Sequence, residues 1–166
     1  MNPLLAAALV LLVAVAAAFA FAPRAAIVTT VQIDATPAQV WKVLADPAGY
    51  EEWNPFLVKM EGRLEEGSRL TNTMRPSGGR TTTFRPVVLA ATPGKELRWL
   101  GRLFVPRLFD GEHYFLLEER DGGTWLTQGE EFRGIGLWLI DVEQFRPDFE
   151  ALDAALKARV EARVEG

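Results

Sequence analysis

The chain begins with 22 residues that carry no charged side chain, and the pattern then changes abruptly to short alternating segments. Residues 3–22 hold 20 uncharged, almost wholly apolar residues. As a helix this run is about 30 Å long, which matches the hydrocarbon core of a bilayer. We therefore predict a single-pass anchor in residues 1–24 and one folded domain in residues 25–166.

The alternative for this run is a cleaved signal peptide, with Ala18-Phe19-Ala20 as an A-x-A cleavage site. Against cleavage, no Lys or Arg precedes the run, and the run is longer than a usual signal core of about 7–15 residues. Arg24 lies just after the run and nothing basic lies before it, which favours a cytoplasmic domain by the positive-inside rule. Cleavage would instead give a secreted or periplasmic protein.

Beyond Ala25 the pattern predicts a strand followed by a helix. Ile27–Asp34 alternates and is rich in β-branched residues. Thr36 suits an N-cap, Pro37 the first helical position, and Gln39 completes a capping box. The apolar residues of this helix are spaced for one buried face: Val40, Val43 and Leu44.

The middle of the chain is predicted to be strands and tight turns. Gly- or Pro-containing segments separate six apolar, alternating runs, as in hairpins. Short connections between consecutive strands indicate an antiparallel meander. The predicted strands are 56–64, 69–75, 81–92, 96–104, 113–119 and 124–132.

The chain closes with a long amphipathic helix. Its apolar residues step by three and four positions, which places them on one face: Phe149, Leu152, Leu156, Val160 and Val164. Pro147 either starts this helix or kinks a longer one that begins near Leu137. The charged residues of the helix are expected to be solvated: Asp148, Glu150, Asp153, Lys157, Arg159 and Arg163.

Several stretches carry a family resemblance. "IDATPAQVWKVLADPAGYEEWNPF", "LRWLG", "DGEHYF", "EEF" and "ALKARVE" together resemble the START-related, birch-pollen-allergen-like helix-grip superfamily, in particular its bacterial polyketide cyclase/dehydrase-like branch. The match spans roughly residues 27–164, and the apolar run in front is an addition. The resemblance implies an α+β helix-grip fold, with a curved seven-stranded antiparallel sheet wrapped around the long C-terminal helix. It also implies a hydrophobic cavity between sheet and helix, used for lipids, polyketides, sterols or other apolar molecules.

Strand alternation predicts which side chains line that cavity. Most of the inward residues are apolar and a few are polar, which is the usual composition of a small-molecule site. Inward rows include Leu97 to Leu103, Leu126 to Phe132, and Asn72 beside Leu70. The predicted ligand-binding residues are Trp53, Asn54, Phe56, Val58, Met60, Leu70, Met74, Trp99, His113, Phe115, Leu117, Gln128, Glu130, Phe149, Leu152 and Leu156.

His113 is the single histidine of the chain. One hypothesis makes it a general acid/base with Glu130 on the adjacent strand as its partner. The alternative is that His113 hydrogen-bonds Glu130 or Gln128 to fix the strand pair or orient a ligand. A bulge between Gly129 and Glu131 would move Glu130 to the outer face instead.

The segment "YEEWNPF" also allows two interpretations. Trp53 and Phe56 could form an aromatic gate with Asn54 as a polar anchor. The structural alternative, which we favour, is that Asn54-Pro55 turns the chain into the next strand while Trp53 packs under the first helix.

Composition excludes several other functions. The net charge is −4, so nucleic acid is not an expected partner. With one His and no Cys, we expect no metal site and no thiolate chemistry. Ser68 and Ser77 lack a nucleophile-elbow context, and "GIG" at 134–136 lacks the context of a dinucleotide site, so no cofactor is expected.

These observations predict a membrane-tethered domain that binds a hydrophobic small molecule or lipid without catalysis. The first alternative is a cyclase- or dehydratase-like enzyme that acts on an apolar substrate with His113 and Glu130. The second is a protein-interaction module, co-chaperone-like, with a filled core.

Overall fold

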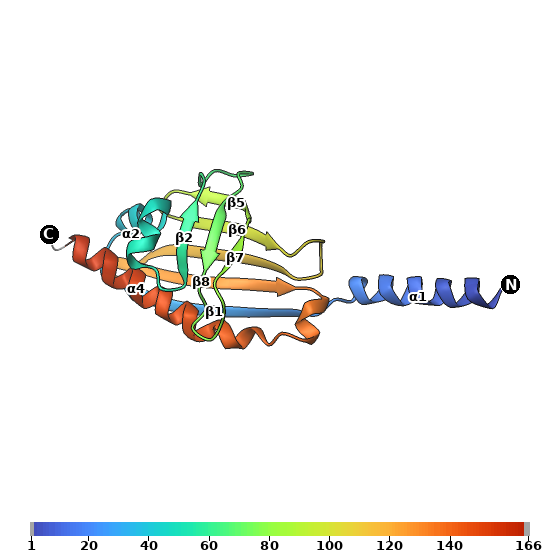
Figure 1. Cartoon of the computed structure of the whole chain (residues 1–166). Coiled ribbons are helices and arrows are strands. Elements are labelled where there is room, and N and C mark those ends of the chain that lie inside the picture. The colour runs from blue at the N-terminus through green and yellow to red at the C-terminus, as the bar shows by residue number, and fades with distance from the viewer. Residues whose placement is uncertain (1, 165–166) are drawn as a thin grey trace.

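The computed structural model describes residues 2–164, and it consists of one folded domain with a helix projecting from one end (Figure 1). The predicted domain ranges also contain Met1 and residues 165–166, which lie outside the described residues. The projecting helix is α1 (Pro3–Ala20), and none of its side chains is buried. It is long and apolar enough to cross a membrane, a test that a signal sequence also passes.

The main sheet has five strands in the order β1-β8-β7-β6-β5, all antiparallel to their neighbours. Its strands are β1 (Arg24–Ile33), β5 (Val87–Thr92), β6 (Glu96–Arg102), β7 (Asp110–Arg120) and β8 (Gly123–Arg133). The β7–β8 hairpin turns at Asp121 and Gly122, which both have positive φ, 52° and 81°. Two such residues match the backbone twist of a tight hairpin.

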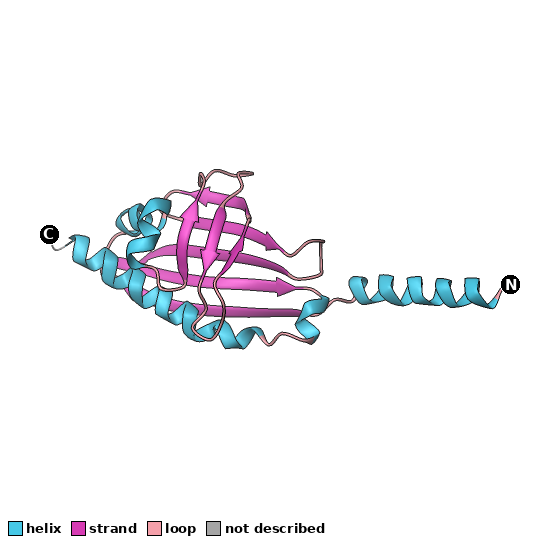
Figure 2. Ribbon diagram, in the orientation of Figure 1, coloured by secondary structure: helices cyan, strands magenta, loops and turns pink. Residues whose placement is uncertain are grey.

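A second, three-stranded sheet has the order β2-β3-β4 and crosses in front of the main sheet (Figure 2). It consists of β2 (Leu57–Glu61), β3 (Thr71–Met74) and β4 (Thr82–Phe84). The α+β fold class is confirmed, but the described chain has eight strands instead of the predicted seven. The predicted strand 81–92 is broken at Arg85-Pro86, because proline has no N–H to donate to a ladder.

The short helices form where the capping signals predicted them. In α2 (Pro37–Leu44) the Thr36 side chain accepts from the Gln39 N–H, and the Gln39 side chain accepts from the Thr36 N–H, so the capping box is confirmed. The predicted apolar face of α2 is buried. A 3₁₀ turn (Pro47–Gly49) and α3 (Tyr50–Trp53) follow before β2.

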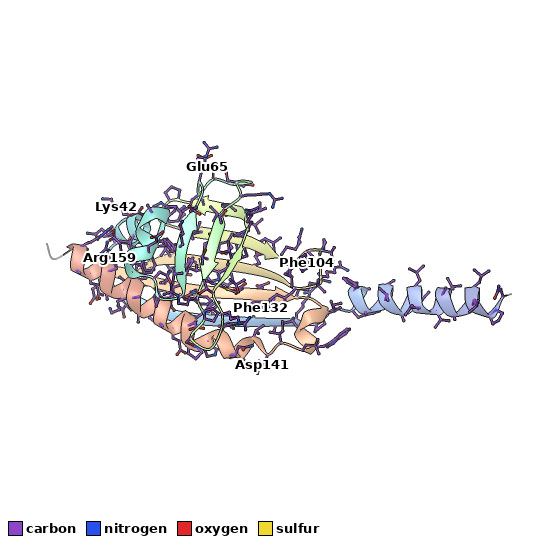
Figure 3. All side chains as sticks on the ribbon, viewed as in Figure 1. Lys42, Glu65, Phe104, Phe132, Asp141 and Arg159 are labelled. Carbon is purple, nitrogen blue, oxygen red and sulfur yellow. The ribbon has the colours of Figure 1, made fainter. Side chains whose placement is uncertain are left out.

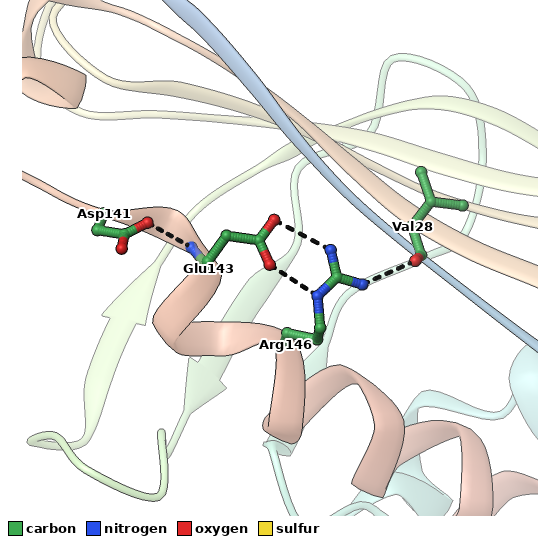
Figure 4. A network of polar contacts seen from close by, with 4 residues as sticks. All are labelled: Val28, Asp141, Glu143 and Arg146. Carbon is green, nitrogen blue, oxygen red and sulfur yellow. Dashed lines mark hydrogen bonds and ion pairs between the residues drawn. The ribbon is translucent and has the colours of Figure 1, made fainter.

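The long helix α4 (Arg146–Val164) begins one residue before Pro147. The proline therefore lies in the first turn of the helix and does not kink a longer one. Two separate 3₁₀ turns precede it, η2 (Ile135–Trp138) and η3 (Val142–Phe145). Arg146 donates to both carboxylate oxygens of Glu143 and to the carbonyl of Val28 at 3.1 Å (Figure 4). Lys157 donates to the carbonyl of Gln32 at 2.8 Å. Basic side chains of α4 therefore cover the free edge of β1, which limits pairing with other chains.

Candidate functional site

The candidate site lies on the inner face of the β7–β8 hairpin, where α4 packs. Along β7, His113, Phe115 and Leu117 are buried, as alternation predicted. Along β8, Leu126, Gln128 and Phe132 are buried and Glu130 is partly buried. The register is continuous from Asp110↔Arg133 to Arg120↔Gly123. The alternative with a bulge at Glu130 is therefore wrong, and Glu130 faces inward.

Three aromatic rings surround His113. The Trp99 indole stacks on the imidazole at a centroid distance of 4.8 Å and an interplanar angle of 3°. The rings of Phe115 and Phe149 lie 4.9 and 5.2 Å from it. The imidazole therefore sits in an apolar environment formed by β6, β7 and α4, with its polar contacts limited to the ring edge.

The Nδ1 atom of His113 lies 3.3 Å from Oε2 of Glu130. The two residues are direct cross-strand partners in the register. Gly111 makes room for this carboxylate, because a Cβ at that position would lie 2.1 Å from Oε1 of Glu130. The Glu130 side chain is 21% exposed, so the pair is within reach of the surface on the Glu130 side.

Gln128 connects His113 to α4. In the orientation that satisfies both ends of its amide, the Gln128 nitrogen donates to the Phe149 carbonyl at 3.2 Å and to Oδ1 of Asp153 at 2.6 Å. The other amide atom lies 3.3 Å from Nε2 of His113. Glu130, His113, Gln128 and Asp153 thus form a continuous chain of polar contacts through the core.

The burial of Asp153 was not predicted, and the expectation that the charges of α4 are solvated is wrong for Asp148 and Asp153. Burial raises the pKa of Asp153 to about 7, and the negative charge of Glu150 adds to the rise. A signal existed in the sequence: Asp153 lies four residues after Phe149, within the apolar stripe of the helix. Asp148 accepts from the Ser77 N–H at 3.0 Å, which ties the β3–β4 loop to α4.

Asn72 on β3 is fully buried, and neither polar atom of its side chain has a hydrogen-bond partner among residues 2–164. It lies between Met60 on β2 and Phe84 on β4 in the small sheet. A buried amide without partners costs free energy, about 1–3 kcal/mol for each unpaired group. Asn72 is therefore a candidate contact for a polar group of a ligand.

Most of the predicted wall residues are buried together. The buried apolar members are Phe56, Met60, Leu70, Trp99, Phe115, Leu117, Phe149, Leu152 and Leu156, and Met74 packs partly buried against them. Val58 is only half-buried, because a bulge between Leu57 and Lys59 gives the buried position to Leu57. Leu103 is exposed, because β6 ends at Arg102. The prediction that Val58 and Leu103 face inward is therefore wrong.

The segment before β2 confirms the turn that the structural interpretation predicts, while the packing of Trp53 under the first helix stays a prediction. Oδ1 of Asn54 accepts from the N–H groups of Phe56 and Leu57, at 3.0 and 2.8 Å, and so fixes the turn into β2. The Trp53 ring packs on Tyr50 at 5.0 Å. The Phe56 ring lies 5.8 Å from that of Phe149 on α4. Ligand contacts by these residues stay a prediction.

Two grooves lie at the surface of the domain. One, of about 560 Å³, runs between β1 and α4, and Asp153 is among its lining residues. The other, of about 460 Å³, lies between the start of β1 and η2 and is lined by Arg24, Trp138 and Leu139 among others. In residues 2–164 no group of three or more His, Cys, Asp or Glu side chains could hold a metal ion.

Comparisons with known proteins agree with this architecture. The model of a family described as "Polyketide cyclase / dehydrase and lipid transport" matches residues 24–161. No curated protein matches. The crystal structure of Ara h 8.0201 is similar with a TM-score of 0.65 at 15% identity, over 84% of this chain and 99% of that one. Protein NE0264 from Nitrosomonas europaea gives 0.68 at 16%, over 85% and 97%.

One similar structure carries a biosynthetic name, the di-domain ARO/CYC BexL from the BE-7585A biosynthetic pathway. Its TM-score is 0.62 at 18% identity, over 86% of this chain and 50% of that chain. At these identities the likeness concerns the fold alone.

Proposed function

This chain belongs to the family described as polyketide cyclase/dehydrase and lipid transport, and on that premise we propose that it binds a hydrophobic small molecule or lipid beside a membrane. The ligand would insert between the two sheets and α4, among side chains that pack as one core in the structure. Its apolar body would contact the predicted wall residues, and a polar group would contact Asn72 or the His113 chain.

The observation that carries this proposal is the pairing of an apolar interior with a few convergent polar groups. His113 is enclosed by Trp99, Phe115 and Phe149. Binding sites for small molecules commonly combine apolar walls with few, well-placed polar groups. The unpartnered amide of Asn72 adds a donor and an acceptor. A ligand with a carbonyl or hydroxyl oxygen at one end of an apolar body would satisfy it.

The membrane tether in this proposal rests on α1. Its 18 residues are apolar and none of them is buried. If α1 spans a bilayer, the domain is held at the surface, where apolar ligands are concentrated. A tether then raises the effective concentration of lipid seen by the domain. The predicted cytoplasmic orientation stays a prediction.

The test is native mass spectrometry of the full chain released from lipid nanodiscs, followed by organic extraction of bound molecules. We expect a discrete adduct of lipid or polyketide size that Asn72→Leu weakens. Thr73→Val is the matched control, because Thr73 is the next residue on β3 and its hydroxyl contacts Thr83 at the exposed face. A clean apo mass, together with no uptake of a fluorescent fatty acid, would contradict binding and favour the protein-interaction alternative.

A second candidate function is a cyclase- or dehydratase-like reaction, favoured by the contact between His113 and Glu130. In such a reaction His113 would move a proton at the substrate while Glu130 holds the imidazole in position. This function predicts that His113→Ala abolishes turnover of an apolar polyketide-like substrate while binding persists. Loss of binding alone, with no turnover in the unmodified protein, would identify His113 as part of a binding wall.

A further inference from the structure

The exposed apolar side chains of the domain gather at the end from which α1 projects. Three segments form this α1-proximal end: residues 21–24, 103–109 and 134–140. Outside α1, the described chain has nine exposed large apolar residues, and seven of them belong to these segments: Phe21, Leu103, Phe104, Val105, Trp138, Leu139 and Ile140. Only Val28 and Val164 lie elsewhere. Such concentration on one end is unusual for a surface that faces only water.

The three segments are joined into one unit by backbone hydrogen bonds. Gly134 N–H donates to the Pro23 carbonyl at 3.1 Å, and Ile135 N–H to the Arg107 carbonyl at 3.0 Å. The Arg107 guanidinium also contacts the carbonyl of Phe19 at the end of α1 at 3.4 Å. The exposed apolar side chains are therefore held beside the chain's exit from α1, as Figure 3 shows for Phe104.

The loop between β6 and β7 is held in a strained conformation. Phe104 and Arg107 have φ angles of 56° and 64°, in a region that side chains other than glycine rarely adopt. The N–H of Arg107 donates to Oδ2 of Asp110 at 3.0 Å within the domain, but the side chain of Phe104 is 87% exposed and gains no burial from this conformation. Strain at an exposed aromatic residue suggests that the loop is shaped for contact with something outside the domain.

Charge at this end also differs from that of the whole chain. The net charge is −4, but residues 21–24, 103–109 and 134–140 contain two arginines, Arg24 and Arg107, and no acidic residue. Arg133 lies beside them, and the positive charges of Arg107 and Arg24 lower its pKa. Of the neighbouring acids, Asp110 contacts Arg102 at 3.4 Å, Glu143 pairs with Arg146 at 2.7 Å, and Asp141 accepts from the Glu143 N–H at 3.0 Å. Arginines at the rim of an apolar surface suit the phosphates of lipid headgroups.

We propose that the α1-proximal end is a membrane-docking face, in which Phe104, Trp138 and Leu139 enter the interface of the bilayer that holds α1, while Arg24 and Arg107 contact anionic headgroups. This inference rests on the proposed tether, since α1 sets which surface meets the bilayer. The groove between the start of β1 and η2 borders this face: Arg24, Trp138 and Leu139 line one part of it, and Asp141 and Glu143 line the part beyond the face. A tryptophan ring is suited to the interface between headgroups and acyl chains.

Docking would place the candidate site close to the lipid. β7 begins at Asp110, next to the α1-proximal end, and His113 is three residues further along the strand. That separation is about 10 Å at the usual rise of a strand. The carboxylate of Glu130, the partly exposed partner of His113, reaches toward Gly111, which is two residues nearer to this end of β7. An apolar ligand leaving the bilayer would then have a short route to the polar chain.

The experiment uses the full chain reconstituted in vesicles of phosphatidylcholine and phosphatidylglycerol. Flotation after an alkaline carbonate wash reports insertion of α1, and phosphatidylcholine brominated in its acyl chains quenches tryptophans that enter the bilayer. Trp138 is the single tryptophan of the three segments, so Trp138→Phe gives the background. We expect carbonate-resistant flotation and quenching that Trp138→Phe removes.

Two variants test the chemistry of docking. Phe104→Ser with Leu139→Ser should shift the docked–undocked equilibrium about tenfold or more toward the undocked state, judged from the transfer of two apolar side chains. Val28→Ser with Val164→Ser is the matched control and should leave the quenching unchanged. Arg24→Gln with Arg107→Gln should weaken docking about fivefold or more per charge on anionic vesicles and little on neutral ones.

The outcomes separate this inference from the tether. Carbonate-resistant flotation without quenching of Trp138 overturns the docking face and leaves the anchor in place. Carbonate extraction refutes the anchor, and the face then stands only if the extracted chain still shows the quenching on anionic vesicles. A blue shift of Trp138 that depends on protein concentration in detergent would instead identify a second copy as the occupant and overturn the proposal.

Discussion

The imidazole of His113 lies parallel to the indole of Trp99, with their centroids 4.8 Å apart and an angle of 3° between the planes. The two residues face each other in the β6–β7 register, so the sheet itself fixes the stack. Both are buried. Trp99 therefore serves as core and as a wall of the candidate site, and the orientation of the histidine depends on it.

Replacement of this indole should destabilise the whole domain. We expect Trp99→Ala to lower the free energy of unfolding by about 3–5 kcal/mol, because it removes a large buried ring. Trp138→Ala, at an exposed position, should change it by less than about 0.5 kcal/mol. Urea denaturation followed by circular dichroism measures both. An equal loss in the two variants would mean that Trp99 is not a core residue.

Asn72 and Asn54 are both buried asparagines, but substitution should have opposite effects. Without ligand, Asn72→Leu should stabilise the domain by about 1 kcal/mol, because it removes a buried amide that lacks partners. Asn54→Leu should destabilise it by about 1–3 kcal/mol, because two buried N–H groups lose their acceptor. Denaturant melts of the ligand-free protein measure this difference. A loss of stability in Asn72→Leu would show that its amide is already hydrogen-bonded in the free protein.

Substitution of Gly111 and of Gly129 by alanine should lower the stability of the domain by different amounts, because the added methyl group meets different atoms at the two positions. At Gly129 a Cβ would lie 2.3 Å from the Tyr114 ring, and Gly129→Ala should cost about 1–3 kcal/mol because a rigid ring must move. At Gly111 it would meet the tip of Glu130, which can swing away, so Gly111→Ala should cost less than about 1 kcal/mol. It should nevertheless displace Glu130 from His113.

The single histidine makes this displacement measurable, since the ring nitrogen signals in an NMR spectrum belong to His113 alone. We expect Gly111→Ala to shift them. Gly101→Ala is the control, because Gly101 is the cross-strand partner of Gly111 and a Cβ there finds ordinary contact distances, 3.5 Å and more. Unchanged signals in Gly111→Ala would indicate that Glu130 does not hold the imidazole.

Asp153 should make stability depend on pH. Its pKa rises from 3.8 to about 7 on folding, so the folded protein binds this proton more tightly than the unfolded chain. The contribution is fully present below about pH 4 and is lost as the pH rises through about 7, with a slope of at most about 1.4 kcal/mol for each pH unit. Denaturation at several pH values measures the slope.

Asp153→Asn should remove this dependence, while Asp121→Asn, at an exposed hairpin turn, should leave it intact. If Asp153→Asn retains the full slope, other groups cause the pH dependence, and Asp153 is ionised in the folded protein over the whole range.

The local patterns of the sequence determined the elements of this protein. The charge-free residues 3–22 predicted α1, and the capping box from Thr36 to Gln39 predicted α2. The helix-grip fold was what the family resemblance implied. Alternation also placed His113, Gln128 and Glu130 on one face of the hairpin, because successive side chains of a strand point to opposite faces. Such patterns depend on near neighbours in the chain, so the sequence contains them directly.

Tertiary structure alone decided the remaining contacts between distant residues. Asp153 is buried because α4 turns it toward Gln128, and Asn72 lacks partners because the second sheet encloses it. Packing also sets the bulge in β2 that buries Leu57 in place of Val58. It likewise brings together the three distant segments of the α1-proximal end. These features join residues that are far apart in sequence. The free energy of each contact depends on a distance in the folded chain, which the spacing of neighbouring residues in the sequence does not specify. The sequence alone therefore predicted the inward faces of the strands and named Glu130 and Gln128 as partners of His113. Only the folded chain added Asp153, the unpartnered amide of Asn72 and the face nearest α1.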